Sequence, residues 1–453
     1  MKFRGLLVGA ALLAALSLGV WYSNKLEKEK EGKPAPDAPP KVIEISRDDI
    51  TQVEVARTGG ETTVIKRNGS NWELTAPKAA RVDQDAANSV VDTFKSLAAD
   101  RLVEEKTTDW AGFGLATPKT AVTVTKKDGK SVKLLMGDEV PASGGAYARL
   151  DGDPRLFTLS AFNKGAVEKG QKDLQDRRLL PFDSDKLSRV ELSSGGNSLE
   201  FGKNAKGEWQ IVKPKPMRAD GANVDDLVRR LKEVKLDLTV SEADAKRTAA
   251  DFAKGTPAAV AKVTDASGTH TLEVRKVPGK EKENLYYGKG SGIEGFLQLT
   301  RDLGDGVTKP LNDFRQKKLF DFGWTDPSRV EVKDTANAVT RVLVKDSGKW
   351  KEGSAEMDSI SVQTLIDKLR DLAATNILDA GGSTPFYEAT VVAGEGKKSE
   401  KVSISKTGEK YFAVREGEAA AYEITKVASD ELQKVAKDVK PAVAAAKPDA
   451  KKK

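Results

Sequence analysis

The spacing of apolar residues changes from a period of two to a period of three and four at three places along the chain. Alternating apolar positions indicate short half-buried strands, and a stripe with helical spacing indicates an amphipathic helix. The opening strand of each set ends in Val53-Glu-Val55, Val190-Glu-Leu192 and Val330-Glu-Val332. The pattern therefore predicts three successive groups of strands, each followed by one amphipathic helix.

Each of these helices is expected to begin at an aspartate that follows a tryptophan. The pairs are Trp72 and Asp83, Trp209 and Asp220, and Trp350 and Asp358. An aspartate in this place caps free N–H groups of the first helical turn. Each tryptophan is expected to pack under its helix. The third apolar stripe contains Ile360, Val362, Leu365, Ile366, Leu369 and Leu372.

Equivalent positions recur at offsets of 137 and 140 residues, as in Val53, Val190 and Val330. A fixed period of this kind predicts copies of one structural unit. The second half of each copy again alternates like strands, with a hairpin signal at Asp128-Gly129. The predicted fold class is α+β, with three tandem repeats after one N-terminal transmembrane helix. Each repeat is a mainly antiparallel sheet of about seven strands, with one amphipathic helix packed on it and a short closing helix.

The N-terminus carries a long uncharged segment. Lys2 and Arg4 precede residues 5–22, a run of 18 residues without charge. A helix of this length spans about 27 Å, close to the ~30 Å hydrocarbon core of a bilayer. We expect an uncleaved signal anchor in the bacterial inner membrane, with the bulk of the chain in the periplasm. The alternative is a signal peptide cleaved after Gly19, which would release a secreted periplasmic protein.

The composition changes at both ends of the repeated region. Residues 23–41 alternate charge and then become rich in proline, and residues 441–453 are rich in alanine, lysine and proline. Such segments bury little apolar surface and are expected to be solvated. The predicted boundaries are 1–22 for the anchor, 23–41 for the linker, 42–178, 179–318 and 319–440 for the repeats, and 441–453 for the tail.

The charge and the absence of cysteine narrow the classes of function. The net charge is +7, carried by 75 basic and 68 acidic side chains. Because the two signs are mixed along the chain, a nucleic-acid-binding surface is not expected. The chain has no cysteine, which excludes disulfides, thiolate metal sites and cysteine nucleophiles.

Several short motifs in the first repeat carry a family resemblance. They are Phe113-Gly-Leu-Ala-Thr-Pro118, Asp128-Gly129, Leu134-Leu-Met-Gly137 and Tyr147-Ala-Arg149. Together with the tryptophan-to-aspartate pattern, they resemble the DUF4340 family, bacterial domains of unknown function, over most of residues 42–440. The second and third repeats lack the Phe-Gly-Leu-x-x-Pro element. The resemblance implies a location in the cell envelope and, in some relatives, association with auxiliary components of gliding-type ABC transporters. The family has no assigned catalytic residues.

Apparent catalytic motifs occur in the wrong context. The glycines of residues 290–295 match a dinucleotide-binding pattern, but a strand follows them where a helix is needed. Ser403 and Lys406 have the spacing of a serine–lysine pair but lie in a predicted strand. His270 is the only histidine, and it is expected to be an exposed strand residue. We therefore predict no catalytic, cofactor-binding or metal-binding residues, and a protein that is not an enzyme.

Carboxylate pairs and aromatic side chains are the remaining candidates. Asp225-Asp226 is expected on the solvent face of the second helix. Exposed aromatics could stack on sugars, with Trp110, Tyr286, Tyr287 and Trp324 as candidates. The basic pairs Arg177-Arg178 and Lys317-Lys318 are expected to be linker surface between repeats.

The sequence favours a membrane-tethered extracytoplasmic scaffold or accessory protein, because tandem repeats on a spacer multiply binding surface. Its expected partners are the membrane and an envelope protein, with ABC transporter components implied by the resemblance. A polysaccharide-binding or cell-wall-binding protein and an envelope hydrolase are the alternatives. The oligomeric state is left open.

Overall fold

The computed structural model describes residues 40–141, 143–279, 283–324, 327–394, 396 and 398–442. The chain divides into two compact units, Met1–Arg177 and Arg178–Lys453. The predicted membrane anchor, linker and tail lie outside the described residues, except for the residues at their inner edges. Within the described residues, no helix combines the length and the apolar character that crossing a membrane requires.

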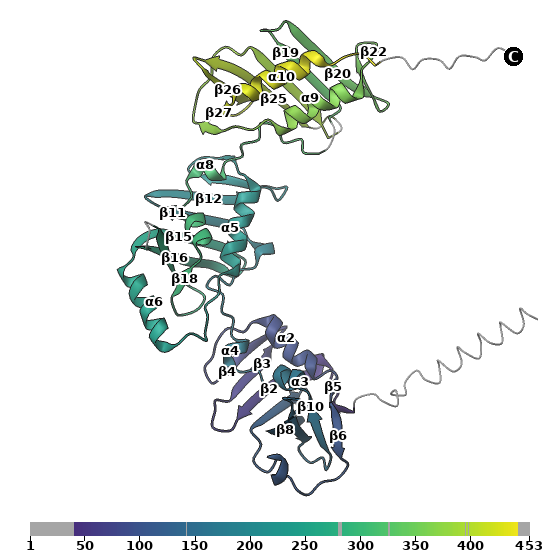
Figure 1. The fold of residues 1–453 in the computed structure, drawn as a ribbon, viewed down its shortest axis with the longest axis vertical. Helices are drawn as coiled ribbons and strands as arrows, with labels where there is room; N and C mark the ends of the chain where they lie inside the picture. The colour runs from purple at the N-terminus through teal and green to yellow at the C-terminus, as the bar shows by residue number, and fades with distance from the viewer. Residues whose placement is uncertain are drawn as a thin grey trace, which may run out of the picture. The chain divides into compact units, whose positions relative to one another are not determined.

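Three large sheets dominate the described chain, one in the first unit and two in the second (Figure 1). All strand pairs in them are antiparallel, and helices are interspersed between the strands. The prediction of an α+β fold with antiparallel sheets is therefore confirmed. The sheets have 8, 8 and 9 strands, more than the seven expected for each repeat.

The first sheet and its helices come from residues 47–174. Its strand order is β4 (Asn71–Ala76), β3 (Thr63–Asn68), β2 (Ile50–Arg57), β7 (Thr120–Lys126), β8 (Ser131–Glu139), β9 (Ala146–Leu150), β10 (Leu156–Leu159) and β6 (Arg101–Glu104). A separate small sheet pairs β1 (Lys41–Ile43) with β5 (Leu97–Ala98). The helices are η1 (Arg47–Asp49), α2 (Gln84–Thr93), η2 (Ala111–Phe113), α3 (Ala161–Val167) and α4 (Gln171–Leu174).

The second sheet repeats the order of the seven strands from β4 to β10, lacks a counterpart of β6, and adds one strand at the opposite edge. It runs β14 (Met217–Arg218), β13 (Trp209–Lys213), β12 (Asn197–Lys203), β11 (Arg189–Ser194), β15 (Thr256–Asp265), β16 (Gly268–Pro278), β17 (Asn284–Gly290) and β18 (Leu297–Leu299). Its helices are η3 (Ser184–Lys186), α5 (Gly221–Glu233), α6 (Glu242–Lys254), α7 (Arg301–Thr308) and α8 (Leu311–Phe314). The sequence pattern missed α6 entirely.

The third sheet adds strands at its edges. It runs β22 (Ala355–Glu356), β21 (Lys349–Glu352), β20 (Val339–Asp346), β19 (Arg329–Asp334), β24 (Tyr387–Ala393), β25 (Lys398–Thr407), β26 (Lys410–Arg415), β27 (Ala421–Ile424) and β23 (Asn376–Leu378). Helices α9 (Ser359–Asp371) and α10 (Lys426–Asp438) lie side by side over it (Figure 1). With 13 residues, α10 is not the short closing helix expected.

The three aspartates cap their helices as predicted. The Asp83 carboxylate accepts hydrogen bonds from the Asp85 and Ala86 N–H groups at the start of α2. Asp220 and Asp358 each accept one, from Asn223 and Ser361 respectively. The apolar stripes behind these caps are buried, with one exception. Ile360 was expected in the third stripe but is 78% exposed, because it lies on the outer side of the first turn of α9.

Each tryptophan is buried beside its helix, but only two of them bond to it. The Trp72 indole N–H donates to Asn88 Oδ1 at 3.2 Å, and the Trp209 indole N–H donates to Asp225 Oδ1 at 2.7 Å. The residue equivalent to Asn88 and Asp225, five positions after the capping aspartate, is Gln363 in α9, and its side-chain amide donates to Asp367 at 2.9 Å. Asp225, expected to be simple solvated surface, is therefore a specific partner of the buried indole.

Replacing Trp209 with Phe is expected to cost about 1–2 kcal/mol more than replacing Trp350 with Phe. Both changes remove ring volume, but only the first removes a hydrogen bond to a carboxylate. Chemical denaturation of the two full-length variants measures the difference. Equal losses of stability would show that the Asp225 bond contributes nothing.

A backbone contact closes each sheet and was not visible in the sequence. In each case the backbone N–H of the capping aspartate donates to a carbonyl at the end of the last helix that follows the sheet, or just after that helix. These contacts are Asp83 N to Leu174 O at 2.8 Å, Asp220 N to Phe314 O at 2.7 Å, and Asp358 N to Lys440 O at 2.9 Å. Each capping residue therefore starts its helix and also holds the end of its own sheet.

Candidate functional site

The single histidine lies in a compact polar cluster at the turn between β15 and β16. Ser267 Oγ lies 3.1 Å from His270 Nε2 and 2.6 Å from Asp265 Oδ1. Asp265 is buried, and the His270 side chain is only 16% exposed, so the prediction of an exposed histidine is wrong. The tight turn folds these three residues together because Ser267 bonds back to Asp265.

This cluster does not have the geometry of a nucleophilic triad. In a triad, the carboxylate and the hydroxyl contact opposite nitrogens of the imidazole. Here Asp265 Oδ1 lies 3.7 Å from Nε2, the nitrogen that also contacts Ser267. The Ser267 hydroxyl donates to Asp265, so the histidine is not placed to remove its proton. The arrangement is that of a stabilised turn.

The pKa of Asp265 gives the turn a measurable signature. Burial raises this pKa, but hydrogen bonds from the Asp183 N–H, the Ser267 hydroxyl and the Ser267 N–H outweigh burial and lower it to about 2. A lowered pKa means that the carboxylate stabilises the fold above pH 3.8 and that this contribution is lost as the pH falls toward 2.

Replacing Asp265 with Asn is therefore expected to flatten the acid side of the stability profile. A shift from 3.8 to about 2 corresponds to roughly 2 kcal/mol between these pH values. Unfolding free energies measured from pH 5 to pH 2 test this. A variant with the same pH slope as the native chain would contradict it.

The glycines that resemble a nucleotide-binding loop serve packing. Residues 290–295 connect β17 to β18, as the sequence indicated. A Cβ on Gly290 would lie 2.4 Å from the Leu179 carbonyl oxygen, and one on Gly292 would lie 2.6 Å from the Arg178 oxygen. The segment of Arg178 and Leu179, which leads into the second sheet, lies against this loop. A side chain at Gly290 or Gly292 would collide with it, so both positions require glycine. Ser403 and Lys406 lie in β25, also as predicted.

The carboxylate pairs are engaged in local contacts. Asp226 accepts bonds from Arg229 and Arg230 on its own helix, and Asp153 pairs with Arg155 at 2.6 Å. Within the described part of the chain, no group of three or more histidine or carboxylate side chains could hold a metal ion.

The four candidate aromatics differ sharply in exposure. Tyr286 and Tyr287 are each only 5% exposed, so the prediction that they could stack on sugars is wrong. Both lie on β17, and their hydroxyls donate to Asp305 and Asp251. Trp110 is half-buried with the Arg149 guanidinium 4.3 Å from its ring centroid. Only Trp324 is open to solvent, with 87% of its surface exposed.

Trp324 is exposed but supported from beneath. The Arg370 guanidinium lies 5.2 Å from its ring centroid and 5.3 Å from that of Phe322. Arg370 is buried, and it donates to the Gly323 carbonyl at 2.6 Å and to Asp367 one turn back on α9. The Trp324 ring therefore lies next to a guanidinium group that is itself held in place by hydrogen bonds.

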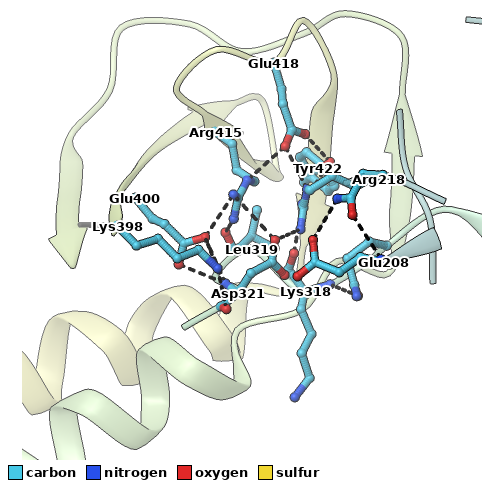
Figure 2. A network of polar contacts seen from close by, with 12 residues as sticks. Glu208, Arg218, Lys318, Leu319, Asp321, Lys398, Glu400, Arg415, Glu418 and Tyr422 are labelled. Carbon is cyan, nitrogen blue, oxygen red and sulfur yellow. Dashed lines mark hydrogen bonds and ion pairs between the residues drawn. The ribbon is translucent and has the colours of Figure 1, made fainter. Parts of the chain in front are cut away.

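A polar network within the second unit was missed by the sequence pattern (Figure 2). Its centre is Arg218 on β14, whose side chain is only 18% exposed. The guanidinium donates to Asp321 at 2.8 Å, to Glu418 at 2.7 Å and to the Lys318 carbonyl at 2.9 Å. It thus connects an edge strand of the second sheet to two other segments, the one that leads into the third sheet and the turn after β26.

The other half of this network belongs to the third sheet. Arg415 on β26 donates to Glu418 at 2.9 Å, to Glu400 at 3.1 Å and to the Leu319 carbonyl. The Tyr422 hydroxyl donates to Glu418 at 2.5 Å. Burial and this hydrogen bond raise the pKa of Tyr422. The guanidinium groups and carboxylates are thus matched in ion pairs, an arrangement suited to joining two sheets.

A cavity of about 470 Å³ lies beside Arg218. Its lining includes Trp209, Asp225, Asp321 and Lys398. The basic residue Lys318, expected as linker surface, contributes its backbone carbonyl to the network, which fixes the connecting segment in place.

Comparison with protein-family models identifies the family of this chain. The DUF4340 model, described as a domain of unknown function, matches residues 72–209 and 209–390. The chain belongs to the DUF4340 family. Neither the curated proteins nor the solved structures gave a match.

The DUF4340 motif of the first unit has a clear packing role. The loop containing Phe113 and Gly114 lies directly on β8, where a Cβ on Gly137 would be 2.2 Å from the Phe113 carbonyl oxygen. Gly114 has φ = 69°, which favours glycine. The loop buries Leu115 in a second apolar cluster with Leu135 and Leu156. This motif therefore covers a face of the sheet in the DUF4340 protein.

Proposed function

We propose that this DUF4340 protein is a non-enzymatic scaffold or accessory binding protein of the bacterial envelope. In this proposal, three tandem α+β repeats follow an N-terminal transmembrane helix that tethers them outside the cytoplasm. The partner is an envelope protein complex, for which the family resemblance favours components of a gliding-type ABC transporter.

The Arg218 network is the observation that carries this proposal. Arg218, Asp321 and Glu418 form matched ion pairs within the second unit. Paired charges of this kind hold two surfaces together in a defined register. Two repeats joined in this way present a larger continuous surface than either alone, which suits a protein that binds other proteins.

Trp324 supports a specific contact on that surface. Exposed tryptophans that become buried on binding supply much of the energy of protein interfaces. Because the Arg370 guanidinium lies 5.2 Å from the ring centroid, part of the conformational freedom of the ring is already restricted before a partner covers it. We therefore place the partner contact at Trp324.

The test is capture of the partner from native membranes with full-length tagged chains. The native chain, Trp324→Ser and Phe162→Ser are compared after cross-linking. Phe162 on α3 is 83% exposed and serves as a matched control. We expect a membrane complex to be recovered with the native chain and the control, and recovery to fall at least tenfold with Trp324→Ser. Recovery of no membrane-complex partner, or turnover of an envelope substrate by the purified chain, would contradict the proposal.

A cell-wall polysaccharide is a second candidate ligand, favoured by the open ring of Trp324 alone. Stacking on a sugar should change Trp324 fluorescence when polysaccharide fragments are added. If the fluorescence does not change and protein capture depends on Trp324, then a protein partner and not a polysaccharide binds at Trp324. An envelope hydrolase is the third alternative, and the turnover assay addresses it.

A further inference from the structure

The second sheet has a cavity of about 850 Å³ that is not part of the Arg218 network. It lies between the hairpin of β11 and β12 and the segment that joins α7 to α8. Leu192, Leu199, Val307 and Leu311 form much of its apolar wall. Its volume falls within the ~300–1,000 Å³ typical of ligand sites.

The charged residues of the cavity have one sign. Lys213 and Lys309 line it, and no carboxylate belongs to the described residues of its wall. Lys213 is 62% exposed and contacts Glu200 at 2.7 Å, outside the lining. Ser194, Asn197 and Thr308 add polar groups to the wall. The site thus combines an apolar interior with ammonium groups.

The first sheet fills the equivalent place with an arginine. Strand alignment makes Arg57 at the end of β2 the counterpart of Ser194 at the end of β11. The Arg57 guanidinium donates to the carbonyl of Glu168, the residue that ends α3. A Cβ on Gly170 would lie only 2.8 Å from this guanidinium. The Arg57 side chain, although exposed to solvent, therefore bridges the β2–β3 hairpin and the end of α3.

The third sheet fills the same place from the neighbouring strand. Val332 of β19 pairs with Arg341 of β20, just as Leu192 pairs with Leu199 in the second sheet. Arg341 donates to the carbonyls of Ala436 at 3.1 Å and Val439 at 2.9 Å, at the end of α10. An arginine again bridges the hairpin and the closing helix.

The second sheet has Ser194 and Leu199 at these two positions. A small hydroxyl and an aliphatic side chain cannot bridge the gap, so the cavity remains. Its presence is therefore a property of this sheet's sequence and not of the order of the seven strands that all three sheets share.

We propose that this cavity binds a small amphiphilic anion, an apolar chain ending in a carboxylate or phosphate. The apolar chain would lie against Leu192, Leu199 and Val307, and the anionic end would face Lys213 and Lys309. Apolar burial provides affinity, and the two ammonium groups select the charge. This site does not depend on the scaffold role proposed above.

Calorimetric titration of the full-length chain with dodecanoate tests the proposal. Dodecyltrimethylammonium has the same chain length with the opposite charge and should bind at least tenfold more weakly. A second titration with monoacyl phosphatidylglycerol distinguishes a lipid headgroup from a free fatty acid. Whichever of the two anions binds more tightly is the closer match to the natural ligand. Equal binding of the cationic and anionic probes, or no binding of either anion, overturns the proposal.

Two variants locate the site. Ser194→Arg restores the arginine of the first sheet and should weaken dodecanoate binding at least tenfold. Ser193→Arg places the same side chain on the opposite, exposed face of β11 and should leave binding unchanged. Unchanged binding in Ser194→Arg would place the ligand elsewhere and overturn the assignment.

A second change tests the charge without filling the cavity. The double variant Lys213→Gln/Lys309→Gln should weaken dodecanoate binding at least fivefold and bring it close to that of the cationic probe. It keeps the proposal testable if Ser194→Arg does not fold. Retention of full affinity and selectivity by this variant would contradict the role of the lysines.

Discussion

Replacing Arg218 with Ala is expected to lower the free energy of unfolding of the full-length chain by about 3 kcal/mol. The side chain is only 18% exposed, and its removal takes from Asp321 and Glu418 one of the two guanidinium groups that pair with them, leaving only Arg415. Removing one partner of a buried ion pair costs more than the pair itself contributes, because the remaining charge stays desolvated. Urea denaturation gives the magnitude, and hydrogen exchange at residues 315–324 shows whether the junction opens first.

The matched control is Lys215→Ala. Lys215 also reaches the third-sheet region, where it contacts Asp379 at 3.0 Å, but the two side chains are 52% and 77% exposed. Exposed ion pairs of this kind contribute about 0–1 kcal/mol. If the two variants lost equal stability, burial of Arg218 would not be the reason for its effect. A double-mutant cycle with Glu418→Ala then isolates the energy of that one pair.

The elements that the sequence predicted correctly depend on local rules. Asp83, Asp220 and Asp358 cap helices because a short carboxylate can reach the free N–H groups of a first turn wherever the chain places it. Strands alternate because side chains point to opposite faces. Hairpin glycines such as Gly129, with φ = 80°, mark turns for the same local reason.

The features that were missed depend on contacts between distant residues. Arg218 and Glu418 are 200 positions apart, and nothing in the local pattern of either indicates the other. The tyrosines of β17 were expected to be exposed aromatics that could stack on sugars, yet helices cover them. Helix α6 covers Tyr287, whose hydroxyl contacts Asp251. A single sequence shows which side chains are aromatic but not which helix lies over them.

The cavity of the second sheet is another feature that the sequence alone does not predict. Aligning the repeats makes Arg57 and Ser194 equivalent, but only the structure shows that Arg57 bridges a hairpin and a helix end. Once this role is known, the substitution becomes informative. If the cavity binds its proposed ligand, the differences among the three sheets carry more functional information than their shared tryptophans and aspartates.

Alanine at Gly304 and alanine at Gly306 are expected to have opposite effects on stability, although both glycines lie in α7 and both are buried. A Cβ on Gly304 would lie 2.1 Å from ring carbons of Tyr286. That ring cannot move away easily, because its hydroxyl donates to Asp305 at 2.7 Å on the same helix. Overpacking of this kind costs about 1–3 kcal/mol, and we expect the upper end of that range.

Gly306 has room for the same methyl group. Its nearest neighbour would be a methyl carbon of Leu227 at 3.9 Å, an ordinary van der Waals contact. Alanine there should stabilise the helix by up to about 1 kcal/mol, because it restricts the unfolded chain and favours helical backbone. Thermal unfolding of the two variants should therefore show shifts of opposite sign. Two shifts of the same sign would mean that Tyr286 does not hold α7 in place. Val307, which lies on α7 and lines the neighbouring cavity, would then be free to move.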